Sequence, residues 1–238
     1  MFIENLVETH CHILPEIDDG ARSVDESIRM VQKLQAQGAQ KIISTSHYYS
    51  DSISLNDFVA MRNKAYDTLK KELPFGSPEI LLAAEVYISK YLFHNDDLSP
   101  LCIGNSRYIL IEHPFSSSFS SQSYDRLANM CVDYNVKPVL AHIERYSALM
   151  EDKKKLDEFI ALGCLTQVNI NSFADASRHT RKKLFKYLES GRIHLIGSDC
   201  HNLTSRPPDY SAGVKAIKDK YGREAIDVLM NNANVLAR

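Results

Sequence analysis

The chain has 238 residues, 44% of them hydrophobic and 24% charged, with 28 basic and 30 acidic side chains. This composition excludes a disordered chain, and nine glycine and eight proline residues are too few for a fibrous protein. A net charge of −2 offers no basic surface, so neither nucleic acid nor an anionic membrane is an expected partner.

The N-terminus has no basic segment followed by an apolar one, which argues against a signal peptide. No run approaches the ~18 apolar residues of a membrane helix, so we expect no membrane insertion. The five cysteines include no CxxC pair, which argues against a disulfide framework or a thiolate zinc site. We therefore expect a cytoplasmic location.

Short β-like runs alternate with helical patterns along the chain. The predicted strands are Leu6–Thr9, Lys41–Thr45, Ile80–Ala84, Arg107–Ile111, Lys137–Ala141, Leu165–Asn169 and Ile193–Gly197. The predicted helices are Ser23–Gly38, Asn56–Leu73, Tyr87–Pro100 (the weakest pattern), Tyr124–Tyr134, Lys154–Leu162, Arg181–Ser190, Asp209–Tyr221 and Glu224–Asn231. This alternation predicts an α/β fold, either a parallel barrel or an open doubly wound sheet. The absence of repeats and linkers favours a single domain over residues 1–238.

Histidine or carboxylate side chains follow six of the seven predicted strands. They are His10, His12 and Asp19 after the first strand, His47 after the second, Glu85 after the third, Glu112 after the fourth, His142 after the fifth, and Asp199 and His201 after the seventh. Any one of them alone fits a capping or surface residue. Together they favour a metal site, because barrel and doubly wound enzymes build their active sites at the C-terminal ends of the strands.

Five imidazoles and four carboxylates without a thiolate suit manganese, iron, zinc or magnesium, and are too nitrogen-rich for calcium. Nine groups are more than one ion can use, so two or three divalent ions are expected, with a bridging carboxylate such as Glu85. The other histidines, which are His94, His113, His179 and His194, are interpreted as surface or structural residues.

Two arginines follow proposed ligands closely, Arg145 after His142 and Arg206 after His201. Each can hold a phosphate through its planar fork, or pair with a liganding carboxylate. Cys200 and Arg206 also match the C-x5-R spacing of cysteine-dependent phosphatases. The intervening residues contain no glycine and Pro207-Pro208 follows, so we reject a cysteine nucleophile. Neither Cys200 nor Cys11 is given a role.

The series HxH…DDG…TSH…E…E…AHIERY…SDxHN…RPP resembles the PHP (polymerase and histidinol phosphatase) superfamily. More narrowly, it resembles the manganese-dependent protein tyrosine phosphatases of bacterial capsular and exopolysaccharide operons. The resemblance implies a distorted seven-stranded (β/α) TIM-like barrel with up to three ions, most typically manganese. By analogy, the three ligand sets are His10, His12, Glu85 and Asp199; Glu85, Glu112 and His142; and Asp19, His47 and His201.

The resemblance also implies hydrolysis of phosphotyrosine by a hydroxide that bridges two ions, with Arg145 and Arg206 on the phosphate. The implied substrate is a polysaccharide co-polymerase tyrosine kinase with a tyrosine-rich tail, whose dephosphorylation tunes polymer production. Tyr48, Tyr49 and Phe115 either line the mouth of this site or are ordinary packing aromatics. One alternative is a phosphatase of a small phosphomonoester such as histidinol phosphate. Another is a non-catalytic metal-binding scaffold that docks on the kinase.

Overall fold

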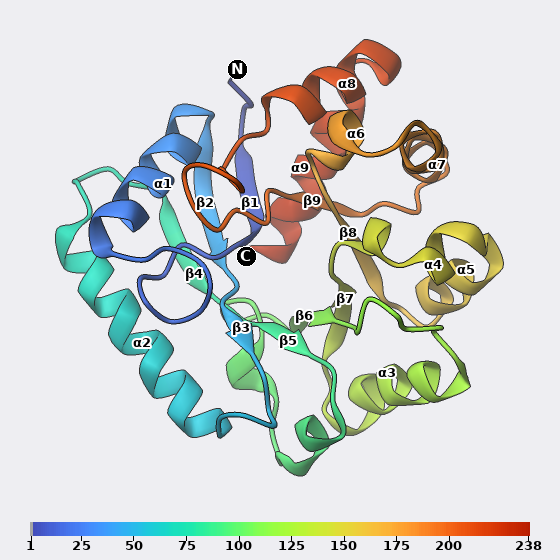
Figure 1. The fold of residues 1–238 in the computed structure, drawn as a ribbon, viewed down its shortest axis with the longest axis horizontal. Coiled ribbons are helices and arrows are strands. Elements are labelled where there is room, and N and C mark those ends of the chain that lie inside the picture. The colour runs from blue at the N-terminus through green and yellow to red at the C-terminus, as the bar shows by residue number, and fades with distance from the viewer. Residues whose placement is uncertain (1) are drawn as a thin grey trace.

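The computed structural model describes residues 2–238, which form a ring of strands with helices around the outside (Figure 1). The strands are β1 (Leu6–Cys11), β2 (Ala39–Ser44), β3 (His47–Tyr48), β4 (Glu79–Leu82), β5 (Glu85–Tyr87), β6 (Tyr108–Glu112), β7 (Lys137–Leu140), β8 (Leu165–Asn169) and β9 (Leu195–Gly197). The α-helices are α1 (Val24–Ala36), α2 (Leu55–Glu72), α3 (Ser121–Asp133), α4 (Ser147–Glu151), α5 (Lys153–Ala161), α6 (Ser172–Asp175), α7 (Arg178–Glu189), α8 (Ser211–Tyr221) and α9 (Glu224–Leu236). Three short 3₁₀ helices are η1 (Lys90–His94), η2 (Ser99–Leu101) and η3 (Ile143–Arg145). No helix within residues 2–238 is both long enough and apolar enough to cross a membrane.

The strands pair in two sheets, β1-β2-β4 and β3-β5-β6-β7-β8-β9, and every pairing is parallel. β3 continues the path of β2, and β5 continues that of β4. The Glu85 N–H joins the two paths, since it donates to the carbonyls of both Thr45 and Ser46. The second and third predicted strands correspond to β2 and β4, and each is followed by a further short strand, β3 or β5, which the apolar pattern did not indicate.

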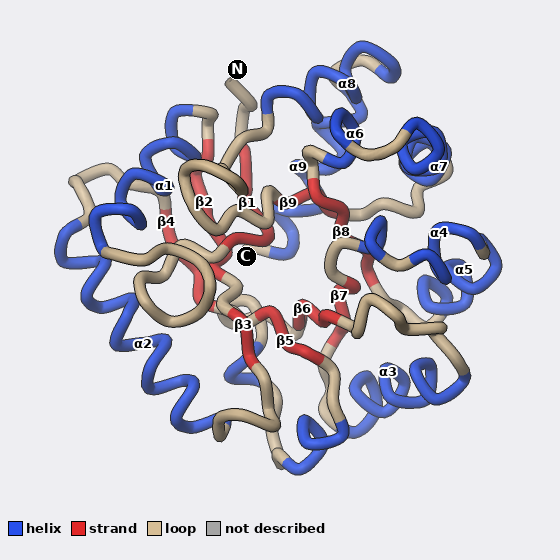
Figure 2. Tube along the Cα trace, in the orientation of Figure 1, coloured by secondary structure: helices blue, strands red, loops and turns tan. Residues whose placement is uncertain are grey.

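The ring closes between β1 and the residues that follow β9. Cys11 and Cys200 form a parallel bridge there, and the Asp199 N–H donates to the His10 carbonyl over 2.7 Å. Figure 2 shows the strands around the centre and the helices outside them. The expectation of an irregular parallel barrel with seven strand positions is confirmed, and the alternative of an open sheet is wrong.

The inside of the ring is apolar at one end only. Buried apolar side chains of the strands meet the end of α9 in a separate cluster that includes Val7, Ile43, Leu110, Val139, Leu195, Ala233 and Leu236. Two side chains of α9 cap backbone at the starts of strands: Asn234 donates to the Asn5 carbonyl, and Asn232 to that of His194. Helix α9 therefore fills the N-terminal end of the barrel, which leaves the C-terminal end for polar side chains.

Local sequence signals set the ends of α1 as predicted. The Ser23 side chain accepts a hydrogen bond from the Glu26 N–H, which satisfies one of the free amides of the first turn. Gly38 follows the helix with a φ of 106°, and a β-carbon there would lie 2.1 Å from the Ile3 carbonyl oxygen. Only glycine fits that position.

The helix predicted over Tyr87–Pro100 is wrong. The segment contains the end of β5 and then the short 3₁₀ helices η1 and η2. The Ser89 side chain caps the first of them by accepting from the Tyr91 N–H, and Pro100 lies in the first turn of the second. Such local caps favour single tight turns over a continuous α-helix. The short helices α4 and α6 were not predicted.

Candidate metal centre

The nine side chains predicted as ligands all lie at the C-terminal end of the barrel. They come from β1 (His10) and the loop after it (His12, Asp19), from β3 (His47), β5 (Glu85) and β6 (Glu112), and from the residues after β7 (His142) and β9 (Asp199, His201). All are buried except Asp19, which is 65% exposed, and His47, which is 13% exposed. The fold therefore gathers residues that are up to 191 positions apart in the sequence.

A first group consists of His10, His12, Glu85 and Asp199, whose ligand atoms lie within 4.8 Å of one another. Glu85 Oε2 lies 3.1 Å from His10 Nε2 and 3.2 Å from His12 Nε2. Asp199 Oδ1 faces the same two nitrogens at 3.5 and 3.6 Å. These four residues are the set that the resemblance assigned to one ion.

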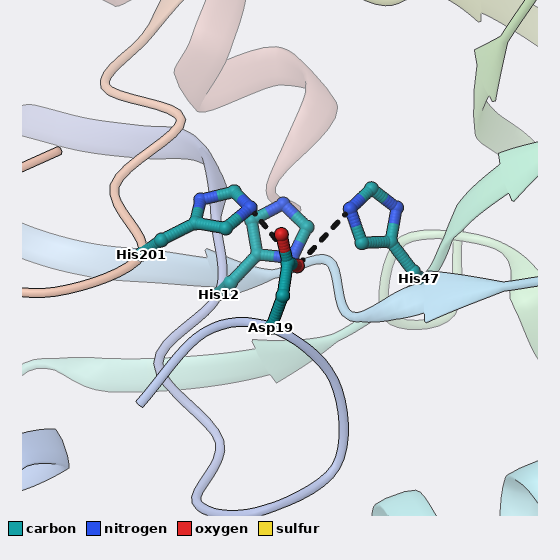
Figure 3. Close-up of side chains that lie close together, drawn as sticks. All are labelled: His12, Asp19, His47 and His201. Carbon is teal, nitrogen blue, oxygen red and sulfur yellow. Dashed lines mark ion pairs between the residues drawn. The ribbon is translucent and has the colours of Figure 1, made fainter. Parts of the chain in front are cut away.

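A second group forms around Asp19, as Figure 3 shows. Asp19 Oδ1 lies 3.4 Å from His47 Nε2 and 3.3 Å from His201 Nε2, and Figure 3 shows the Asp19 side chain between these two rings. His12 completes the group, with its ring centre 3.9 Å from that of His201. The sequence-based set lacked His12, which the structure places between the first and second groups.

A third group consists of His47, Glu85 and Glu112. His142 belongs beside it, because its Nε2 lies 2.8 Å from Glu85 Oε1 and 3.5 Å from Glu112 Oε1. Glu85 thus contacts histidines of all three groups, which is the position that a bridging carboxylate requires.

The pKa shifts divide the histidines of the cluster into two kinds. Burial lowers the pKa of both His47 and His201, the latter to about 4, and the charge of His12 lowers them further. Burial favours the neutral acid at Glu85, but the charge and hydrogen bond of His10 hold its pKa well below the usual value. His47 and His201 therefore carry the neutral imidazole that binds cations. Against the effect of burial, neighbouring carboxylates raise the pKa of His12 and of His142, the latter to about 9, so an ion bound at these two rings displaces a proton. His201 Nε2 is buried and makes no hydrogen bond of good geometry to residues 2–238.

Asp18 is a functional residue that the sequence analysis missed. Its Oδ2 lies 2.8 Å from His12 Nδ1 and accepts the His47 N–H, and its Oδ1 accepts the Gly20 N–H. A carboxylate on the far nitrogen of a ligating histidine fixes the tautomer and the ring orientation. The DDG motif gave the signal, but Asp19 was chosen as the only working residue of the pair.

β8 corresponds to the one predicted strand that no predicted ligand follows, and it carries two supporting amides. Gln167 Oε1 accepts the His142 N–H over 2.7 Å and lies 3.2 Å from His10 Nδ1. Asn169 Nδ2 donates to Asp199 Oδ2 over 2.8 Å. Gln167 and Asn169 are two positions apart, so they share one face of the strand, and this alternation was a signal that sequence analysis overlooked.

Two of the clustered residues have backbone in the left-handed region, with φ of 32° at His142 and 53° at Asp199. Non-glycine residues in this region are strained, and such strain is concentrated at functional sites. Two glycines near the cluster are needed because other parts of the chain pass very close to them. A β-carbon at Gly197 would lie 2.7 Å from His10 Cβ, and one at Gly20 would lie 2.3 Å from the His12 carbonyl oxygen. Both glycines therefore allow the chain to pass directly over β1.

Arg145 and Arg206 meet at the edge of the cluster. Their Nη2 atoms lie 2.7 and 2.6 Å from the same oxygen, Asp199 Oδ2. Their side chains are 34% and 36% exposed, so each also faces solvent. The two arginines line a cavity of about 370 Å³, together with Asn169 and Ser198. Paired guanidinium groups are an arrangement that can hold a tetrahedral anion through their planar forks.

Comparison with known proteins places the chain in a family. The model of the family described as "Capsular polysaccharide synthesis, CpsB/CapC" matches residues 6–238. The chain belongs to the CpsB/CapC family. The tyrosine-protein phosphatase CpsB of Streptococcus pneumoniae is 30% identical over 238 residues, which cover 95% of this chain and 96% of the relative. CpsB of Streptococcus agalactiae serotype V is 29% identical over 241 residues, 98% of each chain.

A solved structure has the same fold as this chain. It comes from work described as "Crystal structures of YwqE from Bacillus subtilis and CpsB from Streptococcus pneumoniae, unique metal-dependent tyrosine phosphatases". It superposes with a TM-score of 0.83 at 24% identity and covers 98% of this chain and 94% of its own. The family resemblance inferred from the motifs is therefore confirmed, and so is the barrel fold that it implied.

Cys200 does not act as a nucleophile in this CpsB/CapC-family barrel. Its side chain is fully buried, and its backbone forms an isolated β-bridge with the backbone of Cys11. Burial also raises the pKa of the Cys11 thiol. A nucleophilic thiolate needs an exposed, electropositive position, so the C-x5-R spacing is accidental here.

The four histidines outside the predicted set also stay outside the cluster. His94 and His179 are exposed, and His194 Nδ1 pairs with Thr166. His113 is buried, and burial lowers its pKa to about 3. Its ring packs 4.6 Å from that of Phe119. Their interpretation as surface or structural residues agrees with these positions.

The aromatic residues at the mouth divide into two kinds. Tyr48 is only 1% exposed and packs against Phe58, so of the two alternatives it is an ordinary packing aromatic. Tyr49 and Phe115 are 39% and 57% exposed. Side chains alternate along β3 and its extension, which turns Tyr48 into the core and Tyr49 outward.

Proposed function

We propose that the nine clustered side chains hold two or three divalent ions and that the protein uses them to hydrolyse phosphotyrosine in a protein substrate. As a member of the CpsB/CapC family, the protein is a tyrosine-protein phosphatase of capsular polysaccharide synthesis. The observation that carries the site proposal is the Glu85-centred cluster, whose Asp199 also holds Arg145 and Arg206. We also propose that residues 1–238 form a single phosphatase domain.

The donor atoms fit such ions. Every proposed ligand is an imidazole nitrogen or a carboxylate oxygen, a set that suits manganese, iron, zinc or magnesium, and we propose manganese. We assign His10, His12, Glu85 and Asp199 to one ion and Asp19, His47 and His201 to another. Glu85, Glu112 and His142 serve a third. Divalent ions at these positions lower the pKa of water and offset the charge of phosphate oxygens.

Side chains of the protein bind and orient the substrate. Arg145 and Arg206 bind phosphate oxygens and orient the ester toward the cluster. Asp199 holds both guanidinium groups before the substrate arrives, so less ordering is needed on binding. Asn169 fixes Asp199 in turn.

The proposed substrate is the tyrosine-rich tail of a bacterial tyrosine kinase that acts in polysaccharide export. Such a tail is extended and exposed, so it can enter an open barrel mouth. The competing substrate is a small phosphomonoester such as histidinol phosphate, and the competing role is a metal-binding scaffold that docks on the kinase.

One experiment separates these proposals. The purified protein, supplied with manganese, is assayed on a phosphotyrosyl peptide and on histidinol phosphate. We expect faster turnover of the peptide, complete loss of turnover with a chelator, and recovery when manganese is restored. A thiol alkylator is expected to have little effect, because Cys200 is buried. Faster turnover of histidinol phosphate would identify a small-molecule phosphatase, and a metal-loaded protein without turnover would identify a scaffold.

The role of Asp18 gives a separate prediction. The Asp18→Asn substitution is expected to weaken manganese binding by about 10-fold to 100-fold, because His12 loses the charge that orients it. Calorimetric titration of the metal-free protein with manganese measures the affinity. Asp51→Asn, an exposed acid in the loop after β3, is the matched control and is expected to bind as wild type does. Wild-type affinity in Asp18→Asn would limit Asp18 to shaping the loop.

A further inference from the structure

Two exposed aromatic rings lie beside histidines of the cluster. Tyr49 lies beside His47, with ring centres 5.4 Å apart, and Phe115 lies beside His142, with ring centres 6.0 Å apart. The two histidines meet through Glu85, whose Oε2 is 3.3 Å from His47 Nδ1 and whose Oε1 is 2.8 Å from His142 Nε2. The third ligand group is therefore bracketed by an aromatic ring at each end.

Both rings are held in place by neighbours. Tyr49 packs against Tyr87, with ring centres 5.7 Å apart, and Phe115 packs 6.3 Å from Tyr146. The Arg145 guanidinium lies 5.8 Å from the centre of the Phe115 ring. Packed rings lose little freedom when a ligand arrives, so they form preorganised surfaces.

The exposed surface of these two rings is suited to binding an apolar part of a ligand. An exposed aromatic side chain leaves apolar area in water, and here that area lies beside ionised carboxylates rather than on a remote surface. Phe115 also joins the cluster to Arg145, which we propose binds phosphate. A phosphate held between this arginine and the third ligand group would have its ester substituent close to the Phe115 ring.

We infer that Tyr49 and Phe115 form an aromatic clamp that holds the phenyl ring of the substrate and so selects aryl over alkyl phosphates. The inference rests on the proposed function and adds to it the residues that recognise the leaving group. In phosphotyrosine a single oxygen separates phosphorus from the ring, so the ring must lie next to the cluster. In phosphoserine the same place holds only a methylene group and peptide backbone. Offset or edge-on packing of the phenyl ring against Tyr49 and Phe115 stabilises the aryl ester alone.

The test compares matched peptides that carry either phosphotyrosine or phosphoserine. The clamp predicts that Tyr49→Ala and Phe115→Ala each lower the ratio of the two kcat/KM values by about tenfold. Tyr49→Phe and Phe115→Tyr keep a ring and are expected to restore the ratio. Phe75→Ala is the matched control, because Phe75 is a fully exposed aromatic in the turn before β4. This control is expected to keep the wild-type ratio.

A binding measurement gives a readout that does not depend on turnover. Calorimetry compares the affinities of the manganese-loaded protein for phenylphosphonate and methylphosphonate. The preference for phenylphosphonate is expected to fall by about tenfold in each alanine variant. If the wild type hydrolyses the phosphotyrosyl peptide and both alanine variants keep the aryl preference, the clamp is overturned and the proposed function stands. If the wild type hydrolyses neither peptide but the phenyl preference disappears in the variants, the clamp stands and the proposed function fails.

Discussion

Replacing Asp199 by alanine is expected to lower kcat/KM on a phosphotyrosyl peptide by about 10³-fold, equivalent to about 4 kcal/mol of lost transition-state stabilisation. Asp199 serves two parts of the site at once. Its Oδ1 faces His10 and His12, and its Oδ2 holds Arg145 and Arg206. The substitution therefore removes a proposed metal ligand and releases both proposed phosphate-binding groups. Steady-state kinetics together with metal analysis of the purified variant test both effects.

Asp157→Ala is a matched control for this prediction. Asp157 also pairs with an arginine, since its Oδ1 lies 2.6 Å from Arg192 Nε, but this pair lies away from the cluster. We expect its loss to leave both activity and bound metal unchanged, since exposed ion pairs contribute about 0–1 kcal/mol. Full activity and normal metal content in Asp199→Ala would remove Asp199 from the proposed site.

The sequence predicted the positions of the strands well, because most strands carry a strong apolar signal. β6 has the run Tyr-Ile-Leu-Ile and is buried almost throughout. The breaks between β2 and β3 and between β4 and β5 escaped prediction, because they depend on pairing across the ring. The Glu85 N–H is shared by two carbonyls of the neighbouring strand, and no local pattern in either segment records this.

The sequence also identified which polar residues gather, but not how they group. His12 was assigned to one ion, yet it lies between Glu85 and the ring of His201. Such a position depends on the curvature of the barrel, which the spacing of residues does not encode. Asp18 and Asp19 present the same difficulty. Adjacent carboxylates of a loop point in different directions, and only the folded loop shows that Asp18 contacts the back of His12.

The cluster depends on closure of the barrel between two segments that are far apart in the sequence. Strand β1 with the loop after it and the segment after β9 supply five of the nine side chains, and the two are joined through the backbone at Cys11 and Cys200. Burying so many ionisable groups without cations is costly, because desolvation disfavours every charged form. The ring therefore gathers carboxylates and imidazoles in one place, which is the arrangement that our proposal of bound divalent ions depends on.

Removing both arginines should separate phosphate recognition from metal binding. Arg145→Ala and Arg206→Ala are each expected to lower kcat/KM by about 10²-fold, and the double variant by about 10³-fold or more. Metal content is expected to stay at the wild-type level, because neither guanidinium contacts a histidine of the cluster and Asp199 is left free for an ion.

Lysine at either position is not expected to restore the rate. Each arginine reaches Asp199 with one terminal nitrogen and keeps the rest of its planar fork for the phosphate, whereas an ammonium group is a single point charge. Arg192→Ala, which breaks the surface pair with Asp157, is the control. Affinity for inorganic phosphate should fall in the same order as kcat/KM, because both depend on the same two groups. Wild-type kinetics and phosphate affinity in the double variant would leave the arginines only as partners of Asp199, and phosphate recognition would then depend on the metal ions alone.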